Sequence, residues 1–143
     1  MHKARWMRRI LGVVLGAIAA VATIFLFEWI AQALYSIPES WESASRADVA
    51  AVLDSIPLPA KLIVVGGWFA GAFCGAWLAL RVSDWGPAAW IVGALMIAGG
   101  IANLVAIPHP AWMQAATVIA PLAGVWLARR VHRKPYRGEP LLG

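Results

Sequence analysis

The chain has 143 residues, of which 62% are hydrophobic and 13% are charged. A water-soluble domain carries about 25% charged residues, so this composition excludes an ordinary soluble fold. The net charge of +5 comes from basic residues near the two ends of the chain. That placement is typical of membrane topology signals rather than of a binding face for nucleic acid, so no nucleic-acid partner is expected.

Four long apolar runs occupy most of the chain, at about residues 10–34, 62–80, 87–107 and 111–128. A helix needs about 20 apolar residues to cross a hydrocarbon core of about 30 Å. Each run is long enough or nearly so. The sequence therefore predicts an all-α fold: an integral membrane four-helix bundle that forms a single membrane domain over residues 1–143.

The first run follows a basic segment, as a signal peptide would. This segment contains Lys3, Arg5, Arg8 and Arg9. The apolar stretch at residues 10–27, however, is longer than the 7–15 residues usual for the core of a cleaved signal. We interpret the first run as an uncleaved anchor whose basic flank stays in the cytoplasm.

The connection at residues 37–59 is the longest segment between runs and is expected to face outward. Ser45 and Asp48 match the acidic form of a capping box. Apolar residues then recur at helical spacing, at Val49, Val52, Leu53 and Ile56. This predicts a short amphipathic helix closed off by Pro57 and Pro59. The helix is either a lid or docking element, or a connector that hides its apolar side, and we favour the connector.

The tail at residues 129–143 follows the fourth run and is strongly basic. Its cations are Arg129, Arg130, Arg133, Lys134 and Arg137. The positive-inside rule places this tail in the cytoplasm together with the N-terminus, which agrees with an even number of spans. Such a cluster also attracts anionic lipid. A topological stop signal is the simpler interpretation.

Small residues at four-residue spacing mark the expected packing surfaces, because helices in lipid associate through close backbone approach. They are Gly12 and Gly16 in the first run, Gly67, Gly71 and Gly75 in the second, and Gly124 with Ala120 and Ala128 in the fourth. The stripe in the second run should face the centre of the bundle. The alternative is a seam between two copies of the chain. Pro121 should kink the fourth helix.

Polar side chains gather at the end of the bundle opposite the termini. Glu28 is the one acidic residue inside an apolar run, and Gln32 and Tyr35 share its helix face. The predicted topology brings Lys61, Asn103, His109 and Gln114 to the same end. A carboxylate inside a membrane is costly, so Glu28 should face the interior of the bundle or find a partner.

Three interpretations of Glu28 are open. It belongs to a proton- or ligand-binding site with Asn103 and His109, since imidazole titrates near neutral pH. It is a structural clasp that accepts hydrogen bonds from Gln32, Asn103 or His109, which is the simplest interpretation. Or it extends to water at the membrane surface. The chain has too few ligands for a metal site and no catalytic or nucleotide-binding motif, so we expect no metal, cofactor or catalysis.

Two stretches carry a resemblance to known proteins. They are Glu28-Trp29 followed by Tyr35-x-x-Pro38, and Ala102-Asn103-Leu104 followed by Ile107-Pro108-His109-Pro110-x-Trp112. With its four spans, nearly the whole chain resembles a group of small, uncharacterised bacterial inner-membrane proteins. The resemblance implies the bacterial cytoplasmic membrane and brings no activity. Small multidrug transporters also have four spans and a Glu in the first. Because Glu28 lies near the end of a long run, they serve only as an analogy for mechanism.

These observations favour a non-enzymatic role. We expect a small structural or accessory membrane protein that associates with itself or with a larger complex. The alternative is a proton-coupled carrier of small molecules in which Glu28 bears the proton. A carrier requires a cavity that reaches Glu28 from one side, whereas an accessory protein should have a packed interior. An enzyme requires a second reactive group beside Glu28 and an open cleft.

Overall fold

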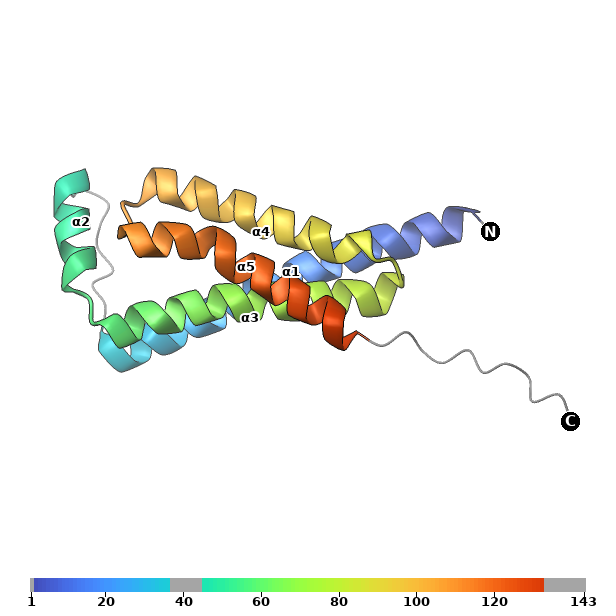
Figure 1. The fold of residues 1–143 in the computed structure, drawn as a ribbon, viewed down its shortest axis with the longest axis horizontal. Coiled ribbons are helices and arrows are strands. Elements are labelled where there is room, and N and C mark those ends of the chain that lie inside the picture. The colour runs from blue at the N-terminus through green and yellow to red at the C-terminus, as the bar shows by residue number, and fades with distance from the viewer. Residues whose placement is uncertain (1, 37–44, 133–143) are drawn as a thin grey trace, which may run out of the picture.

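The computed structural model describes residues 2–36 and 45–132. Within these ranges the chain forms five helices (Figure 1): α1 (His2–Tyr35), α2 (Arg46–Ser55), α3 (Leu58–Ser83), α4 (Pro87–Ala106) and α5 (Ala111–Val131). All except α2 are long and apolar enough to cross a membrane. The predicted all-helical class with four candidate spans is therefore confirmed. Residues 37–44 of the predicted outer connection and residues 133–143 of the tail lie outside the described residues.

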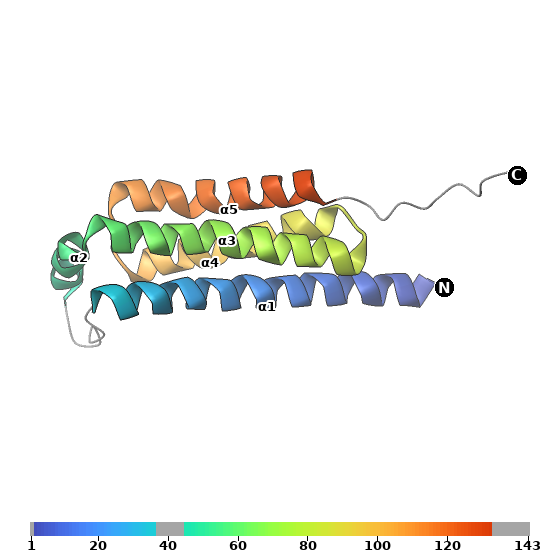
Figure 2. The same ribbon diagram turned by 90° about the horizontal axis from the view of Figure 1, so that it is seen from below.

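The four long helices run side by side, and α2 lies across one end of them (Figures 1 and 2). We call this end the α2 end. The opposite end, which we call the basic end, holds the start of α1, the turn between α3 and α4, and the last turn of α5. The central helix is α3, which packs against α1, α4 and α5, whereas the backbones of α1 and α5 make no close contact.

Three of the long helices extend beyond the apolar runs from which they were predicted. In particular, α1 begins at His2 and α5 continues to Val131. Hydrophobicity marks only the part of a helix that lies in hydrocarbon, while backbone hydrogen bonding continues into the flanking segments. Pro59 does not close α2 as expected. That helix ends at Ser55, and Pro59 lies in the first turn of α3, where an N–H has no helical partner.

Close contact between α1 and α3 depends on glycine. A Cβ atom built on Gly16 would lie 2.5 Å from the carbonyl oxygen of Gly75, and one built on Gly75 would lie 2.5 Å from that of Gly16. The other glycines of the two stripes, Gly12, Gly67 and Gly71, also lie in this contact. The stripe on α3 thus packs against α1 of the same chain, and any side chain here would force the two backbones apart.

The fourth and fifth helices complete the bundle through small residues of their own. Gly124 of α5 lies against the backbone of Phe69 on α3. Gly93 and Gly100 of α4 lie against α5, which continues as a helix through Pro121. Near the basic end, α4 also contacts α1 and α3, because Val92 packs beside Gly16 and Gly75. Toward the α2 end, α4 separates from α1 (Figure 1), so these helices form a wedge that is closed at the basic end.

Arginine and tryptophan side chains pair around the basic end. The Arg9 guanidinium lies 4.9 Å from the ring centroid of Trp85 and 5.4 Å from that of Trp6. Three further pairs have the same arrangement: Arg81 with Trp77, Arg129 with Trp90, and Arg130 with Trp126. Both kinds of side chain are typical of a membrane–water interface, where the ring sits among headgroups and the cation reaches phosphate and water.

The short helix α2 begins at a complete capping box. The Ser45 hydroxyl accepts a hydrogen bond from the Asp48 N–H at 3.2 Å, and the Asp48 carboxylate accepts from the Ser45 N–H at 3.2 Å. The carboxylate also accepts from the Ser45 hydroxyl at 2.6 Å. The side-chain hydrogen bond, followed by the backbone one, lowers the pKa of Asp48. Because both groups satisfy helix N-terminal hydrogen bonds, they fix where α2 starts.

Candidate functional site

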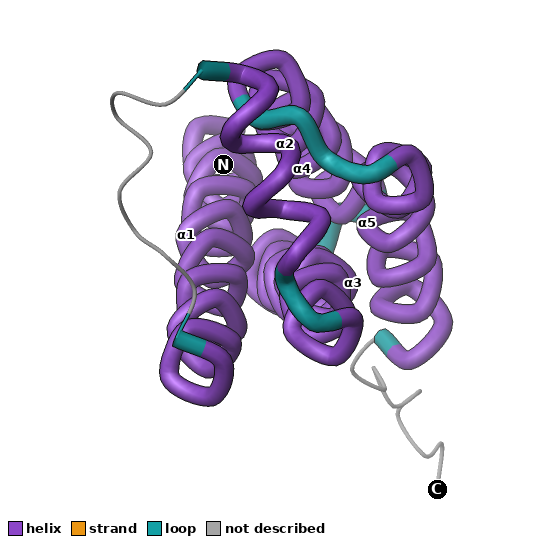
Figure 3. Tube along the Cα trace, turned by 90° about the vertical axis from the view of Figure 1, so that its left-hand side faces the viewer, coloured by secondary structure: helices purple, strands orange, loops and turns teal. Residues whose placement is uncertain are grey.

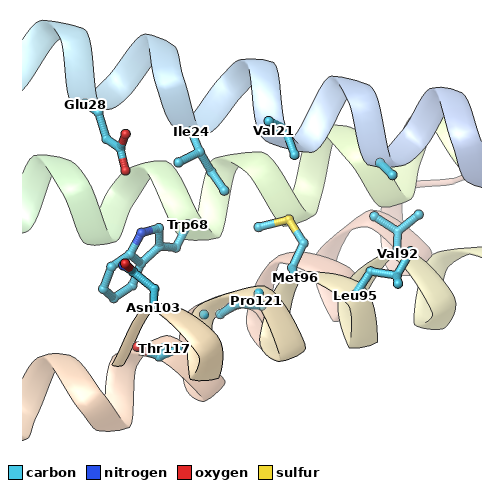
Figure 4. Close-up of a pocket in the computed structure, with 13 residues that line it drawn as sticks. Val21, Ile24, Glu28, Trp68, Val92, Leu95, Met96, Asn103, Thr117 and Pro121 are labelled. Carbon is cyan, nitrogen blue, oxygen red and sulfur yellow. The ribbon is translucent and has the colours of Figure 1, made fainter. Parts of the chain in front are cut away.

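Two hollows meet near the α2 end of the molecule. The first, which we call the groove, separates α1 from α4 and has a volume of about 220 Å³ (Figure 4). The second, which we call the vestibule, has a volume of about 770 Å³ and lies between α2, the long helices and the α4–α5 loop. Glu28, Trp68 and Asn103 line both hollows. We call these three residues the waist, because the groove and the vestibule meet there.

Apolar side chains form most of the groove. Its walls include Val21 and Ile24 of α1, Leu95 and Met96 of α4, and Pro121 of α5. Val92 lines its far end, where α4 closes against α1 and α3. Leu95 and Gly99 line the groove and are exposed at the molecular surface. The groove therefore opens sideways between α1 and α4, on a face that lipid would cover if these helices span a bilayer.

Glu28 supplies the only carboxylate in the four long helices. It lies about 10 Å before α1 ends at Tyr35. Its side chain points from α1 toward Trp68 and Asn103 (Figure 4). Within residues 2–36 and 45–132, no group donates a hydrogen bond to this carboxylate or forms an ion pair with it. The waist therefore holds a carboxyl group with free hydrogen-bonding capacity beside an aromatic ring and an amide.

His109 braces the Trp68 ring from the vestibule side. The two rings meet edge to face, with centroids 6.2 Å apart and an interplanar angle of 64°. The His109 Nδ1–H donates to the carbonyl oxygen of Ile107 at 2.9 Å, and the Gln114 side-chain amide donates to the carbonyl oxygen of His109 at 2.9 Å. These bonds hold the proline-flanked turn in one conformation, so the His109 ring helps to fix the orientation of Trp68.

The roof of the vestibule is α2, which stands off the long helices. It makes no close backbone contact with any of them in the described part of the chain. The end view in Figure 3 shows α2 lying across the ends of the long helices. Val49, Leu53 and Ile56 line the vestibule beneath it. Two cations hold the roof: Arg46 Nη1 donates to the carbonyl oxygen of Val105 at 2.9 Å, and Lys61 Nζ donates to that of Asp54 at 3.3 Å.

The structure brings four of the six predicted polar residues to one space. Glu28, Gln32, Asn103 and His109 all line the vestibule. Gln114 is exposed and reaches the site only through its hydrogen bond to His109. Tyr35 is the last residue of α1 and lines neither hollow. Position along a helix indicated which end a residue belongs to, but not whether its side chain turns toward the gap between α1 and α4.

Trp68 is the functional candidate that the sequence reasoning missed. Tryptophans of membrane proteins usually lie at the ends of spans, but Trp68 lies about 15 Å from the start of α3 at Leu58. That depth is the signal that could have singled it out, because an indole in the middle of a span cannot serve in a headgroup belt. The apolar face of α2 was considered, but the hollow beneath it could not be foreseen.

Comparison with protein-family models, curated proteins and solved structures finds no match for this chain. The described residues contain no group of three or more His, Cys, Asp or Glu side chains that could hold a metal ion. The features of this chain that point to a function are the waist and the two hollows that meet there.

Proposed function

We propose that this chain is a non-enzymatic protein of a bacterial inner membrane that binds a small amphiphilic molecule in the groove and vestibule. One observation carries the proposal: an apolar groove and a polar vestibule meet at a carboxylate that has no partner among the described residues. Binding pockets are concave and mostly apolar, with a few polar groups that orient the ligand. An ionisable residue within a span that faces such a cavity marks a functional site rather than a packing element.

The clasp interpretation receives less support from these contacts. A clasp requires Asn103, Gln32 or His109 to donate to Glu28, but the His109 Nδ1–H is directed to the Ile107 carbonyl. Within the described ranges, Glu28 accepts no hydrogen bond at all. Glu28 and its three predicted partners instead line the vestibule, which has a volume of about 770 Å³. A ligand accounts for both the hollow and the free carboxylate.

In the proposed orientation, the α2 end faces the outside and both termini are cytoplasmic. The charge of the basic end supports this assignment. Its described residues include one acid, Asp84, and seven cations: Lys3, Arg5, Arg8, Arg9, Arg81, Arg129 and Arg130. Cytoplasmic flanks of membrane helices are enriched in such cations. The waist then lies in the outer half of the bilayer, and the groove runs from it toward the middle of the membrane.

Such a protein serves as an accessory subunit, which presents the amphiphile to a second copy or to a larger complex. A second candidate is carriage of the molecule coupled to a proton on Glu28. The observation that favours carriage is the wedge between α1 and α4, which is open at the α2 end and closed where Val92 packs beside Gly16 and Gly75. Such asymmetry is the geometry of one state of an alternating-access cycle.

Filling the groove tests the proposal. Gly99 lines the groove, and a Cβ atom built on it would meet nothing within 4 Å, so this position has space for the added bulk of Gly99→Leu. We expect saturable binding of radiolabelled 1-decanol, an uncharged amphiphile, to the protein in lipid nanodiscs. We expect Gly99→Leu to reduce that binding at least about tenfold and Gly99→Ala to preserve it, because a Leu side chain occupies part of the cavity.

Empty nanodiscs provide the background for partitioning of decanol into lipid. Circular dichroism of each variant checks that the helices are intact. Binding to wild-type protein that does not exceed this background, or that is equal in both Gly99 variants, contradicts the proposed function.

A further inference from the structure

We propose that the amphiphile is a cation whose positively charged nitrogen lies at the waist and whose apolar part lies in the groove. This inference rests on the proposed function and deepens it by naming the chemical class of the ligand. Its basis is the juxtaposition, at the mouth of one apolar groove, of the Glu28 carboxylate, the Trp68 ring and the Asn103 amide.

The charge of the ligand follows from the surroundings of Glu28. Glu28 is exposed where the two hollows meet and lies within a candidate membrane span. An ionisable side chain within a span is stabilised by an opposite charge close to it. Two cations border the vestibule, but both are directed elsewhere: Arg46 to the Val105 carbonyl and Lys61 to the Asp54 carbonyl. No cationic side chain of the described chain pairs with Glu28. A bound cation supplies the missing charge.

The other two waist residues suit the same head group. Indole is the best of the aromatic side chains at attracting a cation to its face. The Trp68 ring is held edge to face by His109 at 6.2 Å, which leaves the ring lining both hollows beside Glu28. The Asn103 side chain adds an amide oxygen that can accept from an ammonium N–H. Carboxylate, indole and amide together form a site for an ammonium or quaternary nitrogen.

The apolar part of the ligand follows from the groove. Between the waist and Val92, its walls are apolar side chains such as Val21, Ile24 and Leu95. Its volume of about 220 Å³ exceeds that of an apolar cavity of about 150 Å³ that accommodates benzene. A single alkyl chain or one aromatic ring therefore fits. The part of the ligand that enters the groove is therefore one alkyl chain or one ring.

An anionic amphiphile does not suit this arrangement. With its chain in the groove, its head would lie against the Glu28 carboxylate, and like charges in a low-dielectric environment repel strongly. To reach Arg46 or Lys61 the head would have to move up into the vestibule and withdraw the chain. The geometry thus discriminates between two molecules that differ only in the sign of their head group.

A matched set of three ligands tests the inference. Decyltrimethylammonium, decyl sulfate and 1-decanol share a chain length and carry charges of +1, −1 and 0. In nanodiscs of zwitterionic lipid, we expect the cation to bind wild-type protein at least about tenfold more tightly than the sulfate. Glu28→Gln removes the charge while keeping the shape, and should weaken cation binding at least about tenfold. Trp68→Leu should weaken it as well, through loss of the cation–π contact.

Asp54→Asn is the matched control for overall charge. It removes one acid from the same end of the molecule, on a residue that is exposed and lines neither hollow. We expect it to leave cation affinity unchanged, and circular dichroism confirms the fold of each variant. Decyl sulfate that binds as tightly as the cation, or cation affinity that Glu28→Gln does not alter, overturns the inference. If 1-decanol still binds in a Gly99-dependent manner, only the ligand class is wrong. If 1-decanol fails to bind, the proposed function fails too.

Discussion

Gly75 and Gly99 differ in what surrounds them, although both are helical glycines in candidate spans. A Cβ atom on Gly75 would meet the Gly16 carbonyl at 2.5 Å, whereas a Cβ atom on Gly99 would meet nothing within 4 Å. The obstacle at Gly75 is backbone, which cannot move aside by changing rotamer. The two positions therefore separate the role of glycine in helix packing from its role in leaving a cavity open.

We predict that Gly75→Leu destabilises the fold and that Gly99→Leu does not. Overpacking costs about 1–3 kcal/mol in typical cores, and a clash with backbone belongs at the upper end of that range. Equilibrium unfolding in mixed detergent micelles measures the difference between the two variants. Equal stability of the two would mean that α1 and α3 are not in contact through their glycine stripes.

Residue-level reasoning from the sequence reached part of the site. It selected Glu28, Gln32 and Asn103, because a polar side chain inside an apolar run is itself a signal. It selected His109 because the predicted topology brings that connection to the same end. It did not select Trp68, since an indole in an apolar run adds no polarity contrast. Whether a side chain faces a cavity depends on which helices pack beside its own helix. The spacing of apolar residues in one sequence does not show which helices these are.

The start of α2 is fixed by residues close to each other in the sequence, Ser45 and Asp48. The Ser45 hydroxyl lowers the pKa of Asp48 below its ordinary value of 3.8. A lowered pKa in the folded state means that the cap contributes stability above the ordinary pKa. This contribution is lost as the pH falls through the lowered value. The start of α2 should therefore hold at neutral pH and loosen only in acid below about pH 4.

We predict that Ser45→Ala returns the pKa of Asp48 to its ordinary range and loosens the first turn of α2. Ser55→Ala is the control, because the Ser55 hydroxyl donates to the Val52 carbonyl and does not touch Asp48. Carbon-13 NMR of the Asp48 carboxyl, followed from pH 6 to pH 2 in micelles, measures both effects. An unchanged titration of Asp48 in Ser45→Ala would show that the hydroxyl does not support the cap.

Element-level prediction succeeded where the signal was local. Apolar runs identified all four long helices, and the Ser45–Asp48 pattern marked the start of α2. Boundaries were less accurate, because Pro59 can stop a helix or begin one, and only the chain's path shows which occurs. The position of α2 over the vestibule could not be predicted. The spacing of its apolar residues would be the same if they faced lipid, packed helices or a cavity.

In the whole molecule, the contacts between the helices determine where the groove lies. The helix α3 takes the centre, and the glycine stripes hold α1 tightly to it over their shared length. The fourth helix is then held by α5 and by the contact of Val92 near the basic end. Nothing comparable joins α1 to α4 nearer α2, so the two helices separate there and leave the groove. The apolar runs, the glycine stripes and the charge distribution of the sequence predict neither the central position of α3 nor the separation of α1 from α4.

The measurement that tests the central claim most directly is a structure of the protein in nanodiscs with a decyltrimethylammonium analogue that carries bromine at the end of its chain. The account predicts bromine density in the groove between α1 and α4, near Val92, and head-group density between Glu28 and Trp68. Bromine found only among lipid around the protein, with α4 packed against α1 along its whole length, would contradict it.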